Sequence, residues 1–429
     1  MRRWLGASAR LGMALTAAAA DAAWTASRAN TARRGAPRRE WPSTLDALAE
    51  TASSQLGEVP EIVHHAGVEL VEDGVETIRG AIAGDRLRQE QFGRRLVDTL
   101  SILGSDIRGH SARREARSKA GVFWRVRRAR ASREGRRDGR PFDLEPALGE
   151  ILRREDPIYT FFALEGLAHD YVKAHLDLGG TAPGGLFDLP AVRRLDAGQL
   201  AALHAGLGLA ASEFLLGGLH SGAGTRQFER SIDRFVGLCR SNAVGPRFRD
   251  VAEEVLGLVA AVFFPRVRSG LEAAMRGRER LRRLYWHGAG RGAYFSGGQL
   301  LPGYGSLARA VELLDARVPA SPWASAAHSG VGYAMTMVNI GEPDVVAGAL
   351  LDARIPSIAS VSVSTGVAGA LSMQELLGQR GQVEAFLVAC ADRMPADLFH
   401  LAVAQPFALV RGAGREHRLY GSLPWGTSA

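Results

Sequence analysis

Acidic residues and a histidine stand beside a glycine motif that recurs along the second half of the chain. The first copy, EGLAHDY, contains Glu165, His169 and Asp170. Glu165 and His169 are four residues apart and share one face of a helix, a spacing that suits proton transfer or metal binding. A metal site needs a third ligand that the local sequence does not supply. We interpret the histidines first as ordinary hydrogen-bonded residues near helix ends, with an acid–base role for Glu165, His169 and Asp170 as the alternative, and we expect no bound metal.

Later copies of the motif carry further polar and aromatic residues. In a superhelix of repeats, equivalent positions line one concave surface, so their side chains could converge on a pocket. The pocket candidates are His204, Glu213, His287, Arg291, Tyr294, His328 and Tyr333. The aromatic residues of these helices could line a cavity for a long apolar molecule. Alternatively, they fill the core between the helices.

The motif itself defines a repeat. Its later copies are GLGLAA at 206–211, GAGRGA at 288–293, GVGYAM at 330–335 and GVAGAL at 366–371. The first glycines are Gly166, Gly206, Gly288, Gly330 and Gly366, with spacings of 40, 82, 42 and 36 residues. A period of about forty residues predicts stacked units, each a helix pair. A weak copy is expected near Gly245, within the longest spacing.

A nucleotide-binding turn is the competing interpretation of the glycines. GAGRGA and GLGLAA both fit the loose pattern G-x-G-x-x-A. Such a turn follows a buried strand, whereas RERLRRLYW before Gly288 has a helical pattern. No acidic residue follows at the distance that would hold a ribose. Glycine inside a helix costs about 1 kcal/mol relative to alanine, so its recurrence predicts very close approach of neighbouring helices.

The elements that must position these residues are helices throughout. Apolar residues recur every three or four positions, and prolines fall between the periodic segments. The one strand-like stretch, SIASVSVS at 357–364, runs into a helical pattern. We predict an all-α fold of stacked helix-hairpin repeats of about forty residues, forming a superhelical or toroid-like array. The expected segments are a disordered leader (1–56), a helical segment (57–107), an arginine-rich linker (108–141), the repeat domain (142–395) and a tail (396–429).

The positive charge of the chain is confined to two segments. Residues 1–40 carry eight arginines against two acidic residues, and residues 108–140 carry thirteen basic residues against three acidic ones. With a net charge of +8 overall, the remainder is net acidic. We interpret 108–140 as a solvated linker. Surface contact with an acidic membrane is the alternative, and a nucleic-acid partner is not expected.

Several classes of protein are disfavoured by what the sequence lacks. It contains no Walker A loop, G-x-S-x-G, HExxH, C-x-x-C or aspartate-rich diphosphate motif. No run of eighteen apolar residues predicts a membrane span. Cys239 and Cys390 are the two cysteines, which favours a reducing cytoplasm. The start, MRRWLGASARLGMALTAAAADAA, faintly resembles a twin-arginine export signal, but Arg10 interrupts its apolar region.

The spaced signatures together resemble one bacterial family. EGLAHDYVKAHLD, LHAGLGLAASEFL, WHGAGRGAYFSGG, AHSGVGYAMTMVNIG and STGVAGALSM occur in that order over roughly residues 155–375. This series is similar to the family catalogued as domain of unknown function 1702. Its members lie beside gene clusters for enediynes and other specialised metabolites of actinobacteria. The family's glycine- and aromatic-rich middle element has no counterpart between Gly217 and Pro265.

The resemblance implies a pathway context rather than a reaction. We expect an accessory protein of actinobacterial specialised metabolism that binds a lipophilic intermediate or a partner enzyme in a helical-repeat cradle. The alternative is an enzyme of unfamiliar mechanism acting on a polyketide or isoprenoid chain in a pocket between helices, with Glu165, His169 and Asp170 as its acid–base or metal-binding groups. No cofactor is expected in either case. Convergence of the polar residues in a closed cavity would favour the enzyme, and their spread along an open groove would favour the cradle.

Overall fold

The chain divides into two compact units. One contains Met1–Ala116 and Ser296–Tyr304, and the other contains Arg117–Phe295 and Gly305–Ala429. The computed structural model describes 142–154, 157–179, 184–220, 222–295, 306–319, 322–352 and 355–412, with five positions between Arg114 and Val122. The expected leader, the segment 57–107, most of the arginine-rich segment and the last seventeen positions, 413–429, lie outside the described residues. The fold below is that of the second unit.

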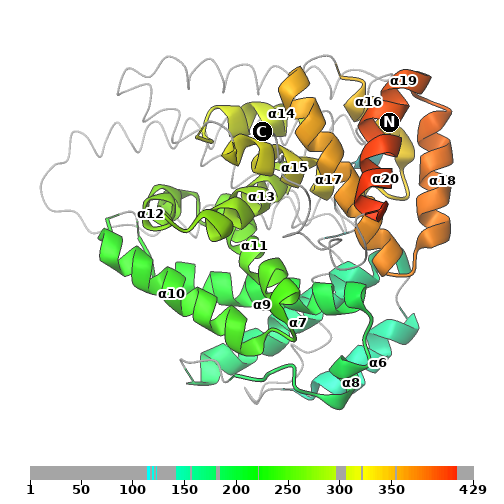
Figure 1. Ribbon diagram of the computed structural model, residues 1–429. Coiled ribbons are helices and arrows are strands. Elements are labelled where there is room, and N and C mark those ends of the chain that lie inside the picture. The colour runs from blue at the N-terminus through cyan, green and yellow to red at the C-terminus, as the bar shows by residue number, and fades with distance from the viewer. Residues whose placement is uncertain are drawn as a thin grey trace, which may run out of the picture. The chain divides into compact units, whose positions relative to one another are not determined.

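Every regular element among the described residues is a helix, which confirms the all-α prediction. The strand-like stretch SIASVSVS lies inside helix α17. Six long helices carry or flank the glycine motifs (Figure 1). They are α7 (Pro157–Gly179), α9 (Ala197–Leu216), α11 (Pro246–Val262), α13 (Glu279–Phe295), α15 (Trp323–Val338) and α17 (Ser357–Leu376).

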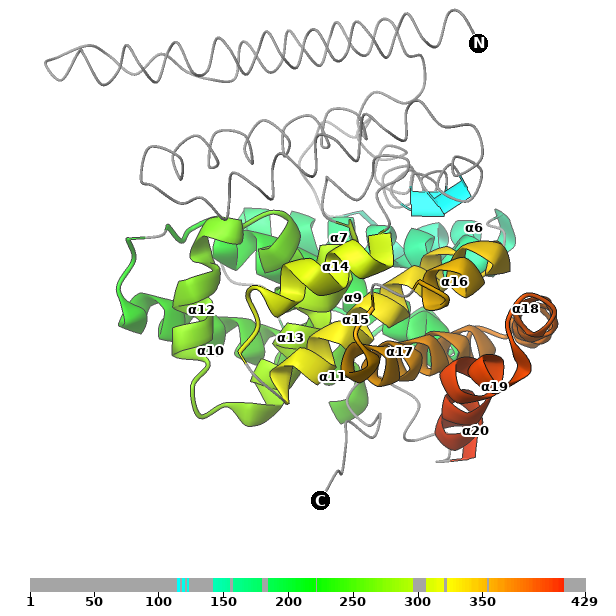
Figure 2. The ribbon, with the colours of Figure 1, turned by 90° about the horizontal axis from the view of Figure 1, so that it is seen from above.

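Shorter or more polar helices lie between and around the long ones (Figure 2). They are α6 (Leu144–Arg154), α8 (Pro190–Arg193), α10 (Thr225–Asn242), the 3-10 turn η1 (Pro265–Val267), α12 (Arg268–Ala274), α14 (Ser306–Asp315) and α16 (Pro343–Leu350). The chain continues through α18 (Arg380–Ala391), α19 (Ala396–Phe399), the π-helical turn η3 (His400–Ala404) and α20 (Gln405–Gly412). Prolines at the first positions of α8, α11 and α16 suit helix starts, because an N–H there needs no intrahelical partner.

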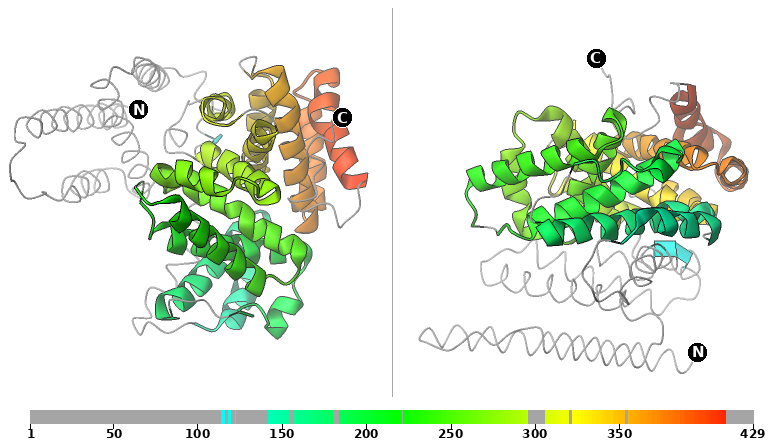
Figure 3. Two further views of the ribbon diagram at one scale, coloured as in Figure 1. Left: turned by 60° about the vertical axis from the view of Figure 1, so that its left-hand side comes forward. Right: turned by 90° about the horizontal axis from the view of Figure 1, so that it is seen from below.

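The long helices pack in chain order. Helix α7 packs on α9, α9 on α11, α11 on α13, α13 on α15, and α15 on α17, while α17 also touches α9. The intervening helices cover them: α10 packs on α9 and α12, and α14 packs on α13 and α15. At the other side, α18 and α20 lie beside α17 (Figure 3). The long helices are therefore the inner elements, which explains why α9 and α15 are almost entirely buried.

The first glycine of each of the four later motifs touches the backbone of the preceding long helix. A Cβ atom added at these glycines would lie far inside the contact distance of a carbonyl oxygen. The glycines, with the facing oxygen and its distance from such a Cβ, are Gly206 (Glu165, 2.3 Å), Gly288 (Glu254, 2.0 Å), Gly330 (His287, 1.9 Å) and Gly366 (Ser329, 2.0 Å). Only glycine fits there, so the predicted close approach of the helices is confirmed.

A second glycine, two residues further on, touches the following long helix. The contacts, in the same notation, are Gly208 (Ala252, 2.2 Å), Gly257 (Tyr285, 1.8 Å), Gly290 (Ala327, 1.9 Å) and Gly332 (Val363, 2.2 Å). The motif G-x-G is thus a two-sided spacer between helix backbones. This contact, and not phosphate binding, accounts for the glycines of GAGRGA.

The weak repeat copy expected near Gly245 is wrong in its position. Gly245 precedes α11 with an extended backbone, and nothing lies near its Cα hydrogens. The close contact of this helix is made by Gly257 instead, and Val255 occupies the first-glycine place. The sequence pattern does not reveal this copy, because valine stands at the first of its two glycine positions.

Substitution of an interface glycine tests this packing. Gly290→Ala places a methyl group against the Ala327 carbonyl, so we expect a loss of about 1–3 kcal/mol of unfolding free energy. Gly237→Ala in α10 is the matched control, because this exposed helical glycine has open space around it. The control should gain up to about 1 kcal/mol. Urea unfolding of both variants measures the difference, and equal effects would contradict the packing role.

Candidate functional site

A buried carboxylate on α11 holds a histidine and an arginine of α13. Glu254 Oε1 accepts a hydrogen bond from His287 Nδ1 at 2.7 Å, and Glu254 Oε2 accepts one from Arg291 Nη1 at 2.7 Å. The Glu254 side chain is fully buried, and those of His287 and Arg291 are 1% and 5% exposed. Burial alone would raise the pKa of Glu254, but Arg291 and His287 bring it below its ordinary value. Glu254 is therefore an ionised anchor.

Glu165 on α7 is a second buried carboxyl group in the same electrostatic environment, with the opposite shift. Burial raises its pKa from 4.5 to about 7. The charge of Arg291 and that of His169 lower this pKa, whereas the charge of Glu254 raises it. Two carboxyl groups whose environments drive their pKa values apart are characteristic of acid–base sites. Near neutral pH, Glu165 exchanges a proton while Glu254 stays charged.

His169 links α7 to α9. Its Nδ1 lies 3.1 Å from Asp170 Oδ1, and its Nε2 lies 3.0 Å from Glu213 Oε2. The His169 side chain is 2% exposed, whereas Asp170 and Glu213 reach solvent at 18% and 27%. Lys173 Nζ lies 3.9 Å from the same Glu213 oxygen. This group of side chains therefore extends from the buried cluster to the surface.

The two tyrosines among the pocket candidates take different places. The Tyr333 ring stands edge-on to the His287 ring at 5.8 Å, and the Arg291 guanidinium lies 5.6 Å from the Tyr333 ring centroid. Tyr294 accepts a hydrogen bond through its hydroxyl from Asn339 Nδ2 at 2.8 Å. The ammonium of Lys119 lies 3.8 Å from the Tyr294 ring centroid, a cation–π contact in a buried position.

His204 and His328 do not join this cluster. His204 donates from Nδ1 to the Leu200 carbonyl at 2.6 Å and accepts at Nε2 from the Val244 N–H at 3.1 Å. Burial lowers its pKa to about 4, so it is neutral and tethers the chain before α11. His328 faces α14, where its Nε2 lies 2.8 Å from Asp315 Oδ1. Both have the geometry of ordinary hydrogen-bonded histidines.

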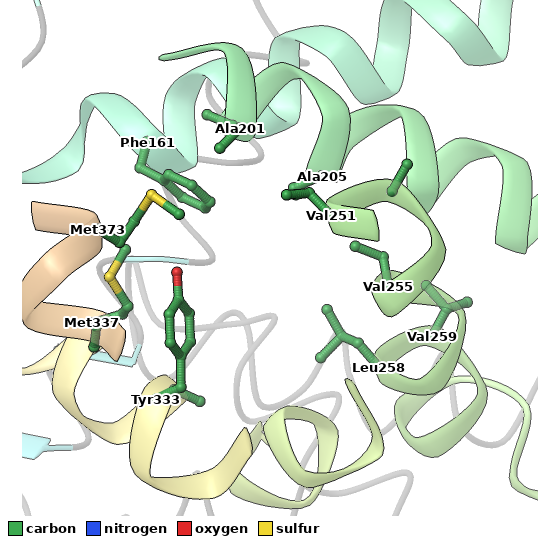
Figure 4. Close-up of a cluster of buried hydrophobic side chains, with 14 of the residues drawn as sticks. Phe161, Ala201, Ala205, Val251, Val255, Leu258, Val259, Tyr333, Met337 and Met373 are labelled. Carbon is green, nitrogen blue, oxygen red and sulfur yellow. The ribbon is translucent and has the colours of Figure 1, made fainter. Parts of the chain in front are cut away.

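A small apolar pocket borders the cluster. It is formed by α7, α13 and α15 and lined by Phe161, Phe162, Arg291, Phe295, Tyr333, Ala334, Met337 and Val338. Phe161, Tyr333 and Met337 approach one another in the interior, with Met373 of α17 beside them (Figure 4). The space inside it that a water-sized molecule can occupy is about 10 Å³, room for about one water molecule and far below the roughly 300–1,000 Å³ of common ligand sites. As it stands, the pocket has room for about one water molecule, so an apolar ligand would enter only if the lining side chains moved apart.

The repeat register explains which residues converge. Glu165, Glu254 and His287 each come directly before the first-glycine position of their helix. Three residues after that position stand His169, Arg291 and Tyr333, on the same helix face as the first set. His204 and His328 lie one residue earlier than the converging set, and one residue rotates a side chain about 100° around the helix. This register would have identified Glu254, which sequence reasoning missed.

Neither a cluster of metal ligands nor similarity to a known protein identifies the role of this site. Within the part of the chain that the structure describes, no three histidine, cysteine or acidic side chains are arranged to hold a metal ion. In the same residues, α9 alone is long and apolar enough to cross a membrane, and 78% of it is buried inside the protein. No protein-family model, curated protein or solved structure matches this chain.

Removing the anchor charge should be costly. Glu254→Gln leaves Arg291 buried without its carboxylate, so we expect a loss of about 3–5 kcal/mol of unfolding free energy at pH 7. Since the folded pKa of Glu254 is lowered, its contribution is present above pH 4.5 and disappears as the pH falls through the folded pKa. The difference in unfolding free energy between the wild type and Glu254→Gln should therefore become smaller at acidic pH. Glu384→Gln, at an exposed ion pair, should change stability by less than about 1 kcal/mol.

Glu165 should show the opposite pH dependence. Its folded pKa is raised, so the stability it contributes is complete below pH 4.5 and is lost as the pH rises through about 7. Relative to Glu165→Gln, the wild-type protein should therefore lose about 3 kcal/mol between acid and alkaline pH. Denaturant unfolding of both proteins across this range measures the change. A difference that is independent of pH would contradict the burial of a titrating carboxyl group.

Proposed function

We propose that the helical domain binds an apolar molecule between α7, α13 and α15 and transfers a proton to or from it through Glu165. The observation that carries this proposal is a buried carboxyl group with a pKa of about 7, electrostatically coupled to an arginine that lines an apolar pocket. A general acid or base works best when its pKa lies near the working pH. Of the two roles expected from the sequence, convergence of the polar groups in the interior favours the enzyme.

Each residue of the cluster has a distinct part in this proposal. Glu165 donates a proton in its neutral form and accepts one in its ionised form. Arg291 places a positive charge at the pocket wall, where it would stabilise negative charge developing on a carbonyl or carboxyl oxygen. Glu254 and its two hydrogen bonds hold Arg291 in place. The aromatic walls exclude water, which strengthens these electrostatic effects.

The biological setting is part of the proposal. The resemblance to domain of unknown function 1702 supports a role in actinobacterial specialised metabolism, on a polyketide or isoprenoid intermediate in the cytoplasm. The residues that carry this resemblance include the spacer glycines and the side chains of the buried cluster. A longer intermediate would present one segment to the pocket.

We also propose how the helices form repeats. We infer helix-hairpin repeats, each a long glycine-bearing helix followed by a shorter one, arranged as a closed ring. Support comes from the glycine contacts, which recur at one register along successive long helices. The contact of α17 with α9 further supports closure, since it joins the last long helix to the second one of the series.

A binding protein without catalysis is the second candidate. It would hold a partner enzyme or a lipophilic intermediate, as the sequence resemblance also suggests. Three exposed apolar side chains near the end of the domain favour a protein partner: Val388 of α18, Leu401 of η3 and Leu409 of α20 are 63%, 62% and 65% exposed. Such a partner would explain these side chains without a reaction in the pocket.

Native mass spectrometry of the protein purified from its host tests the pocket. We expect a bound apolar molecule of defined mass in the wild type and its loss in Ala334→Leu, because the added side chain fills the pocket. Ala408→Leu, at an exposed position of α20, is the matched control and should retain the molecule. Equal occupancy in both variants would contradict this location.

The same measurement separates catalysis from binding. In Glu165→Gln, an enzyme should accumulate a molecule of different structure, the unreacted substrate. An identical molecule in wild type and variant would favour the binding protein. A ligand-free protein carrying a second polypeptide would favour the partner-enzyme role.

A further inference from the structure

We propose that His169, Asp170 and Glu213 form a proton path that connects Glu165 with solvent. This inference deepens the proposed function, because a buried acid that gives up a proton in each cycle must be reprotonated. The path is a set of neighbouring titratable side chains on α7 and α9 whose exposure decreases towards the interior. Only residues of the described domain take part.

Exposure falls in steps along the path. The side chain of Lys173 is 44% exposed and that of Glu213 is 27% exposed, with Lys173 Nζ 3.9 Å from Glu213 Oε2. Asp170 is 18% exposed, whereas His169, which lies between Asp170 and Glu213, is 2% exposed. Water can therefore reach both carboxylates but hardly reaches the imidazole. His169 is therefore the innermost side chain of this group.

Of the titratable groups that act on Glu165, His169 is the one suited to carry a proton to it. They are Arg291 from α13, Glu254 from α11 and His169 from its own helix. The guanidinium of arginine does not release protons in proteins. Glu254 is held ionised by Arg291 and His287, and its side chain is fully buried, so it does not exchange protons with solvent directly. Imidazole, in contrast, both takes up and releases a proton near neutral pH.

In each transfer, one proton enters the path from water and one proton leaves it to Glu165. A proton from water adds to the Glu213 or Asp170 carboxylate and passes to the adjacent His169 nitrogen. His169 then gives a proton to the ionised Glu165 carboxylate, one helical turn away on the same face. Both ring nitrogens of His169 face carboxylates, so the imidazole must turn to bring a nitrogen towards Glu165. The Cβ atoms of the two residues are about 5–6 Å apart at this spacing. After the transfer His169 has its original proton count and Glu165 is neutral.

A pH-jump experiment on the full-length protein, without any ligand, tests the path. Infrared spectroscopy follows the carbonyl stretch of neutral Glu165, which is assigned by its disappearance in Glu165→Gln. We expect the band to form about a hundredfold more slowly in His169→Gln, since glutamine keeps polar contacts but does not carry a proton. Glu213→Gln and Asp170→Asn, at partly exposed positions, should slow it less, because each leaves the other carboxylate in place.

Control variants make the outcomes distinct. His328→Gln removes another buried histidine that is paired with a carboxylate, Asp315, and should leave the rate unchanged. Equal rates in wild type and His169→Gln would overturn the path while leaving the proposed function intact. Absence of a Glu165 band near neutral pH would instead overturn the proposed function. If His169→Gln does not fold, the double variant of Glu213 and Asp170 decides: an unchanged rate overturns the path.

Discussion

Direct contact between helix backbones is the constraint on which the rest of the structure depends. At each interface of the glycine series, a glycine of one long helix lies so close to a carbonyl oxygen of the neighbouring long helix that a Cβ atom would not fit. Such contacts allow weak Cα–H···O interactions and close van der Waals packing. They also fix the axial register of each helix relative to its neighbour. Side chains at equivalent repeat positions are thereby brought to equivalent places.

The buried charges follow from that register. Glu254 on α11 is brought within hydrogen-bonding distance of His287 and Arg291 on α13, and all three are almost fully removed from water. Burying ions is costly unless each is paired and hydrogen-bonded. The arrangement provides a specific partner for Glu254, so its pKa is lowered, while burial dominates for Glu165 and its pKa is raised. A single arginine acts on both carboxyl groups, with different results because only one of them bonds to it directly.

Close packing also limits the interior space. Helices that touch through glycine leave little room between them, and the pocket beside Arg291 is correspondingly small. Its walls are nevertheless aromatic and apolar, with a single charged side chain among them. This composition suits chemistry on a short segment of an apolar molecule. The small size of the pocket also means that any bound segment would lie close to Arg291 and the charged cluster.

The sequence by itself determined the helical class, the close packing at the glycines and the shared face of Glu165 and His169, since each of these follows from local spacing. It also indicated that a repeat copy was missing between Gly206 and Gly288, although not its place. Only the tertiary structure decided that Glu254 belongs to the cluster and that His204 and His328 face other neighbours. The physical reason is that periodicity specifies which residues share a face, but not which helix that face meets. A shift of one residue rotates a side chain by about 100°, so the partners depend on how the glycines set each helix against the next.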